Sequence, residues 1–352
     1  MKLALRPARA ASVLALVCAP AGCSENRTPP PRPEREAASV KAAPTATSQA
    51  TPAGASREPL EALPERAKVD PTVVALGRRL FHEPRLSSSG KVACASCHDL
   101  AKGGVDGQKL STGVGGQLGV VNAPTVYNAA LNFVQFWDGR AATLEEQIGF
   151  PLTTTYEMGS SWDKALAFLS ADPSYSAAFK ASFSDGVTEA NTRQAIADFE
   201  RTLLTKNSPF DRYLAGDEHA ISAEARTGYE TFKSVGCIAC HQGRNVGGNM
   251  FQKFGVLGDY FKDRGHVTDA DYGRYNVTHL ESDRFVFRVP SLRNVERTAP
   301  YFHDGSAATL NQAVQVMARY QLGRKLSDDQ VAALIAFLKS LSGDLAPAGE
   351  KG

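Results

Sequence analysis

This 352-residue chain has almost no excess of positive over negative charge, and it has few long apolar runs. Lysine and arginine number 39 against 37 acidic residues, so the formal net charge is +2, and loss of residues 1–22 with their three basic side chains would leave about −1. That balance leaves no basic field for nucleic acid, which is excluded as an expected partner. The apolar run from Ala11 to Ala19 is too short to cross a bilayer. No segment alternates like a long strand, which excludes a β-rich fold and predicts an all-α one.

Cysteine is also sparse, and its placement is informative. Four of the six cysteines belong to two copies of the motif Cys-x-x-Cys-His, at residues 94–98 and 237–241. One such pair is also compatible with a redox dithiol or with half of a zinc site. Here the motif occurs twice, far apart in the chain, and the histidine that follows each pair makes it the attachment signal of c-type haem. The sequence therefore predicts two covalently bound haem c groups, held by Cys94, Cys97 and His98 and by Cys237, Cys240 and His241.

The first 22 residues have the features of an export signal, with basic residues before the apolar run and small residues before Cys23. Residues 20–23 resemble a lipoprotein cleavage box, although Pro20 replaces the usual leucine. Cys23 would then be acylated and anchor the protein to the membrane; the alternative is an ordinary signal peptide cut nearby. Residues 23–66 are rich in proline, alanine, serine and threonine, which predicts a disordered tether. Both versions place the folded part in the periplasm, where c-type haem is attached.

An internal repeat organises the remaining chain. The block Pro-Thr-Val-Tyr-Asn at residues 124–128 recurs as Pro-Ser-Leu-Arg-Asn at 290–294, and Asp-Gly-x-Ala-Ala-Thr-Leu at 138–144 recurs at 304–310. Both blocks recur at the same offset of 166 residues, and each copy follows one haem motif. The sequence therefore predicts two related cytochrome c-like domains, at residues 67–215 and 216–345.

Helix-start signals agree with this fold class. Asp70 precedes a proline at the first helical position, Thr188 precedes an amphipathic stretch, and Ser327 heads a capping box before the last one. Thr143 and Thr309 head capping boxes at equivalent points of the two copies. These five residues are therefore expected to be helix N-caps.

The two copies carry different residues at the position that could supply a second axial ligand to the haem iron. Met317 lies on the helix expected after Thr309, and a thioether is an iron ligand that raises the reduction potential. Core packing is the commoner role of methionine, and Met250, nine residues after His241, is a rival ligand. The position equivalent to Met317 in the first copy is Pro151. The second haem is therefore expected to be closed, as an electron relay, and the first to be open to oxygen species.

A carboxylate follows in the same region of the first domain. Glu157 lies six residues after Pro151 in a polar stretch. Cleavage of the O–O bond of peroxide requires a proton to move from one oxygen to the other, and a carboxylate beside an open haem can carry it. The alternative is a solvated loop acid.

These residues match a family: the chain resembles the bacterial di-haem cytochrome c peroxidases and their MauG-type relatives over about residues 67–345. The matching blocks lie at residues 81–86, 122–125, 135–140, 147, 157–158, 289–294 and 300–305. The resemblance implies that the first haem is the low-potential, peroxidatic one. It implies that the second haem, with Met317, is the high-potential, electron-transferring one.

The resemblance also assigns roles to side chains between and above the haems. It implies that Glu157 is an acid–base residue and that Gln147 is its polar partner on the distal face. It places Trp137 between the haems as a conduit for electrons, and packing between the domains is the alternative for this side chain.

A calcium ion between the domains is implied as well. Its ligands would be the side chain of Asn122 and the backbone carbonyls of Thr298 and Pro300, all oxygen donors as a hard cation requires.

One departure from the family concerns the glycine-rich loop at residues 111–119. Many family members keep a histidine there that blocks the peroxidatic iron until the other haem is reduced. Counting back from Asn122 places Val114 at that position, and no histidine lies between His98 and His219. Valine cannot ligate iron, so the reductive gate is expected to be absent.

Three functions remain open. The first is a hydrogen peroxide reductase that takes two electrons, one at a time, from a small soluble cytochrome c or cupredoxin. The second is a MauG-like enzyme that oxidises a Trp or Tyr residue of a partner protein. The absent loop histidine is compatible with it, whereas Met317 favours the peroxidase, because the quinone-cofactor maturation branch carries a tyrosine there. The third is an electron carrier without catalysis. The resemblance also implies a homodimer.

Overall fold

The computed structural model describes residues 58–64 and 68–345. The predicted signal at residues 1–22, with Cys23, lies outside the described residues, as does most of the predicted tether. The described residues all fall within one compact unit of the chain. No helix among them is long and apolar enough to span a membrane.

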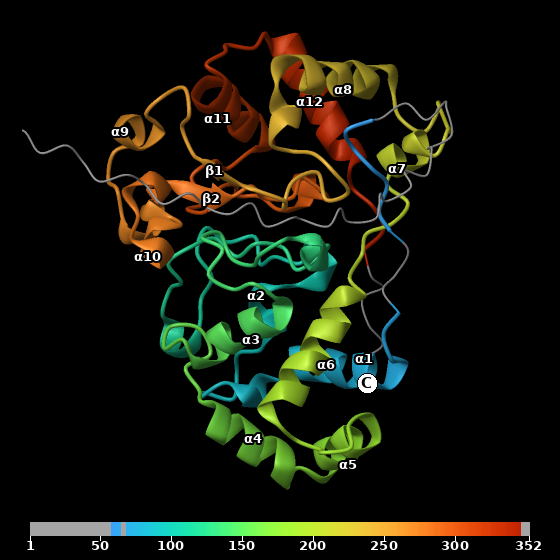
Figure 1. Cartoon of the computed structure of the whole chain (residues 1–352), viewed down its shortest axis with the longest axis vertical. Helices are drawn as coiled ribbons and strands as arrows, with labels where there is room; N and C mark the ends of the chain where they lie inside the picture. The colour runs from blue at the N-terminus through green and yellow to red at the C-terminus, as the bar shows by residue number, and fades with distance from the viewer. Residues whose placement is uncertain (1–57, 65–67, 346–352) are drawn as a thin grey trace, which may run out of the picture. The chain divides into compact units, whose positions relative to one another are not determined.

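The described residues are mainly helical, as Figure 1 shows, which confirms the predicted helical fold class. The only strands among the described residues are short, β1 (Phe251–Lys253) and β2 (Val286–Arg288), and they pair antiparallel. The α-helices are α1 (Pro71–Phe81), α2 (Cys94–Cys97), α3 (Leu144–Thr153), α4 (Trp162–Ala171), α5 (Pro173–Ser182), α6 (Glu189–Arg201), α7 (Pro209–Leu214), α8 (Ala223–Val235), α9 (Tyr260–Arg264), α10 (Tyr275–Thr278), α11 (Leu310–Leu322) and α12 (Asp328–Ser340).

The predicted helix starts are confirmed. The side chains of Asp70, Thr188 and Ser327 each accept a backbone N–H at the start of α1, α6 and α12. Thr143 and Thr309 do the same for α3 and α11, which therefore begin at the predicted offset. The capping box is complete at Thr309 and Ser327 but not at Thr143. Before α3 the reciprocal bond goes one residue further back, because the Glu146 carboxylate accepts the N–H of Ala142.

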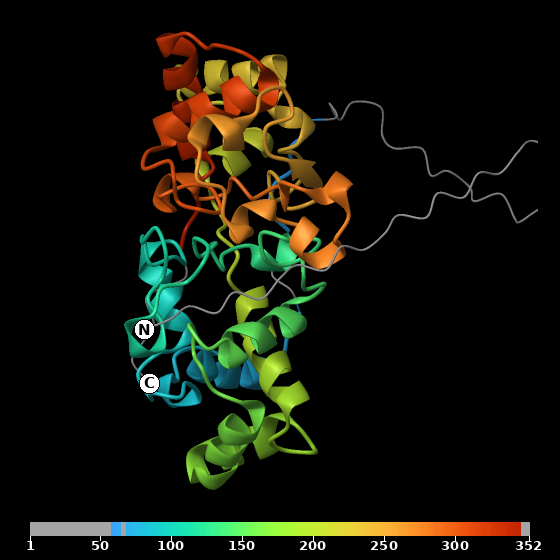
Figure 2. The ribbon, with the colours of Figure 1, turned by 90° about the vertical axis from the view of Figure 1, so that its left-hand side faces the viewer.

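Helices that periodicity did not indicate complete each domain. The pair α4 and α5 covers one end of the first domain, and α8 opens the second (Figure 1). Both α4 and α5 are short and have only a few buried positions each, so neither produces a long apolar stripe. In the views of Figures 1 and 2, the helices up to α6 gather on one side and α8, α11 and α12 on the other.

Each domain is built on two helices that cross at a glycine. Gly77 of α1 lies so close to α6 that a Cβ there would be 1.7 Å from the carbonyl oxygen of Ala195. Gly228 of α8 meets α12 in the same way, with a Cβ position 1.9 Å from the carbonyl oxygen of Ala333. A larger residue at either crossing would push the two backbones apart. The same close approach therefore sets the relation of the first and last helices in both domains.

Two segments pack on the second domain although the sequence assigned them elsewhere. Leu60 lies within the predicted tether, yet it is 2% exposed and packs in the core of the second domain. Phe210 of α7 precedes the predicted boundary at residue 215 and is fully buried in the same core. Composition indicated a tether because proline and alanine dominate the region, whereas Leu60 and the polar contacts of Glu58 and Glu61 hold residues 58–64 on the second domain.

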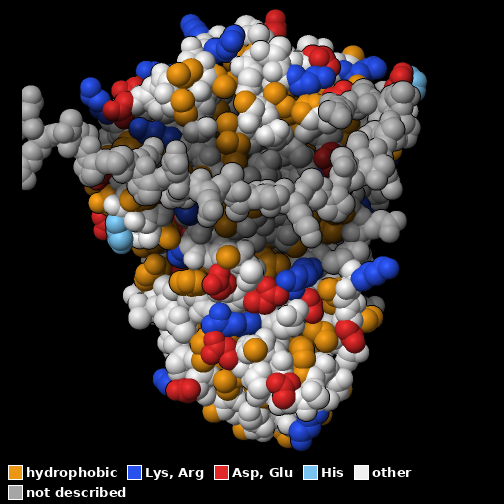
Figure 3. Space-filling view, viewed as in Figure 1, with side chains coloured by type: hydrophobic (Ala, Val, Ile, Leu, Met, Phe, Trp, Pro, Cys, Tyr) orange, Lys and Arg blue, Asp and Glu red, His pale blue; other side chains and the backbone are white. Residues whose placement is uncertain are grey.

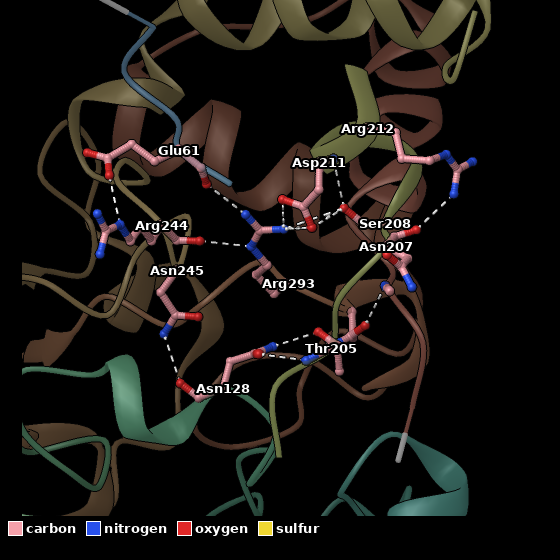
Figure 4. Close-up of polar contacts among 12 residues, drawn as sticks. Glu61, Asn128, Thr205, Asn207, Ser208, Asp211, Arg212, Arg244, Asn245 and Arg293 are labelled. Carbon is pink, nitrogen blue, oxygen red and sulfur yellow. Dashed lines mark hydrogen bonds and ion pairs between the residues drawn. The ribbon is translucent and has the colours of Figure 1, made fainter. Parts of the chain in front are cut away.

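A buried arginine ties these segments together (Figure 4). Arg293 is 1% exposed, and its Nη1 donates to both carboxylate oxygens of Asp211 at 2.8 Å. Its Nη2 donates to the carbonyl of Glu61 at 2.9 Å and its Nε to the carbonyl of Arg244 at 2.8 Å. Burial lowers the pKa of Arg293, and the Asp211 carboxylate opposes that effect. The pair therefore holds residues 58–64 and α7 against the loop that follows the second haem motif.

Candidate functional site

The first Cys-x-x-Cys-His motif forms one turn of helix. Cys94 and Cys97 open and close α2, and the N–H of His98 donates to the carbonyl of Cys94 at 3.0 Å. The second motif forms a tighter turn over Cys237–Ala239, and His241 donates in the same way to Cys237 at 3.0 Å. Each turn places its two cysteines on one side, as two thioether bonds to a single haem require.

The imidazole of each motif is oriented by a backbone carbonyl. Nδ1 of His98 lies 3.2 Å from the carbonyl oxygen of Gly104, and Nδ1 of His241 lies 3.4 Å from that of Val246. A carbonyl only accepts, so Nδ1 carries the proton and Nε2 keeps its lone pair for a metal. Burial lowers the pKa of His98 and lowers that of His241 to about 4, which favours the neutral, ligating form. Both histidines therefore fit a haem iron.

A largely apolar cavity adjoins the second motif. Cys237, Cys240 and His241 line one side, and α11 contributes Met317. Other α11 residues along the same cavity are Leu310, Ala313, Val314, Ala318, Gln321 and Leu322. The rival Met250 does not line this cavity, and its carbonyl instead accepts the N–H of Val289 at 2.9 Å.

Helix α3 presents different chemistry at the equivalent positions of the first domain. Pro151 lies inside α3 where α11 carries Met317. Gln147 is one turn earlier, where α11 carries the cavity-lining Ala313. Gln147 is half-buried, and no hydrogen bond between the described residues joins its side chain to Glu157. The first domain thus offers an amide and a proline where the second offers a methyl group and a thioether.

Glu157 follows α3 and lies near the first haem motif. Its negative charge contributes to raising the pKa of the Cys94 and Cys97 thiols, although burial is the larger cause for both. Burial also raises the pKa of Glu157 itself, and the positive charge of Arg140 opposes that rise. Arg140 is held in place by the carboxylate of Asp138 at 2.9 Å and lies over the ring of Phe136 at 3.5 Å.

The glycine-rich loop at residues 111–119 packs against the turn that carries Glu157. Val114 donates its N–H to the carbonyl of Glu157 at 2.8 Å, and its side chain is 7% exposed. A Cβ on Gly113 would lie 2.1 Å from the carbonyl oxygen of Tyr156, and one on Gly159 would lie 2.9 Å from the Val114 side chain. The residue that the family resemblance aligns with a gating histidine, Val114, is therefore buried and packed beside the turn that carries Glu157.

Trp137 lies where the two domains meet. Its indole N–H donates to the carbonyl of Asn122 at 2.9 Å, and it lines the cavity of the second motif. It also packs with Met317 against the aromatic cluster of Phe254, Phe261 and Phe287. This placement is compatible with an electron conduit and with interdomain packing.

The three predicted calcium ligands also line this cavity. The Nδ2 of Asn122 donates to the carbonyl of Gln108 at 2.8 Å, which leaves its Oδ1 for another partner. Among the described residues no N–H donates to the carbonyl of Thr298 or Pro300. Three oxygen atoms without a donor therefore fit a hard cation.

Several polar residues near these sites were not singled out by sequence reasoning. His303 is 2% exposed, bonds through Nε2 to Asp271 at 2.7 Å, and lies edge-on to Trp137 at 6.4 Å. Asp271 also accepts a hydrogen bond from Arg264. Burial alone would raise the pKa of Asp271, but the hydrogen bonds from His303 and Arg264 hold it well below the ordinary range. His303 belongs to a block that matches the family, whereas Asp271 carries no local signal. The buried Glu200 was also missed, although it lies in the amphipathic stretch predicted after Thr188.

Comparison with known proteins supports the same picture. The sequence model of the di-haem cytochrome c peroxidases matches residues 71–219, and the cytochrome c model matches residues 225–342. Cytochrome c peroxidase Ccp of Escherichia coli K12 is 47% identical over 291 residues, 82% of this chain and 62% of that protein. Cytochrome c551 peroxidase of Nitrosomonas europaea is 45% identical over 291 residues, 82% of this chain and 86% of that protein. The solved structure of a MauG-like protein associated with microbial copper homeostasis has a TM-score of 0.71 and 28% identity, covering 82% of this chain and 94% of that one.

Two helical domains, each with a Cys-x-x-Cys-His turn and an oriented imidazole, define a c-type cytochrome with two haem-binding sites. The chain covers 86% of one peroxidase relative and 62% of the other. This chain belongs to the di-haem cytochrome c peroxidase family, whose members are haem enzymes, and two haem c groups are its cofactors.

Proposed function

We propose that this chain reduces hydrogen peroxide to water in the periplasm, with two electrons delivered one at a time by a small cytochrome c or cupredoxin. The balanced reaction consumes one peroxide, two electrons and two protons and releases two waters. When bound, haem c supplies the iron at which peroxide is reduced and through which electrons pass.

The asymmetry between α3 and α11 carries this proposal. Met317 projects from α11 into the cavity of the second motif, whereas the equivalent position of α3 is Pro151. A thioether ligand suits a relay, and a site without one suits a small oxygen-containing substrate. An electron carrier would need neither this difference nor the carboxylate of Glu157 next to the first motif.

Glu157 is the proposed acid–base residue. Burial holds its pKa above the ordinary glutamate value, and Arg140 limits the rise, so the group keeps a proton more readily than an exposed glutamate and can both accept and return one. Gln147, one turn from Pro151 on α3, is proposed to orient the substrate by hydrogen bonding. Trp137 is proposed to carry electrons between the domains, because it packs against the same aromatic cluster as Met317 and lines the cavity of the second motif.

A calcium ion is proposed at Asn122, Thr298 and Pro300. The indole of Trp137 donates to the carbonyl of Asn122, so an ion that fixes Asn122 would also fix the indole. Chelation is therefore expected to slow electron transfer between the domains.

The two domains are proposed to be copies of one ancestral haem domain. The recurrence of both sequence blocks at one offset supports this, as do the glycine crossings at Gly77 and Gly228. Export and a lipid anchor at Cys23 are proposed from the sequence of residues 1–23. On the face shown in Figure 3, acidic and basic side chains are interspersed over the described residues, which suits a protein without a nucleic-acid partner.

The test is turnover of peroxide by the purified two-haem protein with a chemically reduced small cytochrome c. Oxidation of two donor molecules per peroxide is expected, with the rate lost in Met317→Leu because the relay fails. Absence of donor oxidation by a protein that carries both haems would refute the proposal.

A MauG-like oxidation of a partner protein is the second candidate. The 28% identity with the solved MauG-like protein and the buried Val114 in place of a gating histidine favour it. Mass spectrometry of co-purifying proteins after peroxide treatment separates the two, because only this reaction leaves an oxidised Trp or Tyr on a partner.

A further inference from the structure

One buried carboxyl group among the described residues differs from the others. Glu83, Asp211 and Asp271 are each 9% exposed or less, and each forms an ion pair with an arginine. Glu200 of α6 is 5% exposed, and its carboxyl group makes no hydrogen bond or ion pair with any described residue. A buried carboxylate without a partner costs free energy, so such a group is kept only where something else stabilises it or where it holds a proton.

The nearest charges do not neutralise this carboxyl group. Arg201, the next residue on α6, instead pairs with Glu145 of α3 at 2.5 Å and with Asp198 at 2.8 Å. Directly after α1, His82 approaches the ring of Phe199, the residue before Glu200, and bonds through Nδ1 to the backbone carbonyl of Arg78.

The packing of α6 places Glu200 toward the first haem motif. Its negative charge is, after burial, the largest cause that raises the pKa of the Cys94 thiol. Burial raises the pKa of Glu200 to about 8, and the negative charge of Glu145 adds to this while Arg201 opposes it. The carboxyl group is thus near the atoms that attach the first haem and titrates near neutral pH.

The second domain identifies what this position faces. Gly77 meets Ala195 and Phe199 of α6, and Gly228 meets Ala333 and Phe337 of α12. The residue after each phenylalanine is therefore equivalent, Glu200 in the first domain and Leu338 in the second. Leu338 and Leu334, one turn earlier, line the cavity next to His241. The first domain has an acid at a position where the second has leucine facing its haem cavity.

We propose that Glu200 is the proton-holding group of the first haem, which takes up a proton from solvent when that haem is reduced and returns it when the haem is oxidised. One electron from the donor converts ferric to ferrous iron, and one proton converts the Glu200 carboxylate to the acid. The net charge of the buried site then stays constant, which avoids leaving a charge uncompensated in a low-dielectric interior. The proposal rests on the proposed function only in placing a haem at Cys94, Cys97 and His98.

This role has a consequence for the two potentials. An ionised carboxylate stabilises ferric over ferrous iron by charge attraction, so Glu200 lowers the reduction potential of the first haem where it is ionised. Leu338 exerts no such effect in the second domain. Glu200 lowers the reduction potential of the first haem, and Met317 raises that of the second. Both residues therefore increase the difference between the two potentials.

The experiment is a spectroelectrochemical titration of both haems in the full two-haem protein over a range of pH. In the wild type, the potential of the first haem should fall with rising pH by up to about 59 mV per unit, one proton per electron. In Glu200→Gln this contribution should vanish. At the lowest pH the first haem should have the same reduction potential in both proteins, and at the highest pH its potential should be higher in the variant. Glu200→Leu, which copies the second domain, should behave like Glu200→Gln.

A matched control lies on the same helix. Glu189 is 40% exposed and pairs with Arg193, so Glu189→Gln makes the same chemical change away from the haem and should follow the wild type. Equal first-haem potentials in wild type and Glu200→Gln at every pH would overturn the proposal. Peroxide turnover is measured separately on the same samples. Failed wild-type turnover with an altered Glu200→Gln titration would refute the peroxidase function and leave this inference standing.

Discussion

Replacement of Glu157 by glutamine tests the acid–base role most directly. Glutamate and glutamine side chains have nearly the same size. The hydrogen bond from the N–H of Val114 to the backbone carbonyl of residue 157 is therefore preserved. The proton acceptor is lost. General acid–base groups contribute about 10²- to 10⁴-fold to a rate, which at about 1.4 kcal/mol per tenfold is roughly 3–5 kcal/mol of activation free energy. Peroxide turnover should fall by that factor, with both haem spectra unchanged.

Replacement of Arg140 tests the same role through the pKa of Glu157. Burial raises the pKa of Glu157 and Arg140 lowers it, so the acid limb of the pH–rate profile should lie above the ordinary glutamate value of 4.5. Arg140→Gln removes the opposing positive charge, so the pKa of Glu157 rises further and the acid limb moves to higher pH. Activity at high pH should be retained.

The assay is steady-state peroxide reduction with a reduced cytochrome c over a range of pH. Glu189→Gln, at a partly exposed glutamate on α6, is the control for the chemical change and should match the wild type. An acid limb that moves to lower pH in Arg140→Gln, or unchanged turnover in Glu157→Gln, would show that Glu157 has no role in proton transfer.

Four further outcomes are expected. Met317→Leu should abolish the methionine-to-iron charge-transfer band of the second haem, whereas loss of the band in Met250→Leu instead would show the ligand assignment to be wrong. The oxidised wild type should show a high-spin first haem by electron paramagnetic resonance and react with peroxide without pre-reduction, because Val114 cannot ligate; a fully low-spin spectrum would contradict this. Trp137→Phe should slow interhaem electron transfer in stopped-flow absorbance while sparing the first reaction with peroxide, and equal loss of both would indicate a structural role. Arg293→Met leaves a buried carboxylate unpaired and should reduce the free energy of unfolding by about 3–5 kcal/mol in denaturant titration.

Much of the fold and of the haem chemistry could be predicted because the relevant signals are local. Each Cys-x-x-Cys-His motif spans five consecutive residues, and a helix start needs only its N-cap and first turn. The offset between the two copies located α3 and α11 and paired Pro151 with Met317. The tether was misjudged at residues 58–64 because composition averages over a segment, whereas docking depends on single residues such as the buried Leu60 and on the bond from Arg293 to the carbonyl of Glu61.

The amino-acid sequence by itself determined the number of haems, the residues that attach them, the helical fold class and the family, since covalent chemistry and capping act between near neighbours in the chain. Tertiary structure alone decided which polar groups are buried and paired. Arg293 meets Asp211 across 82 positions of sequence, and His303 meets Asp271 across 32. Glu200 acquires its raised pKa only because α6 packs against α1 and α3 and buries this side chain. Burial depends on the whole fold, and no local pattern encodes it.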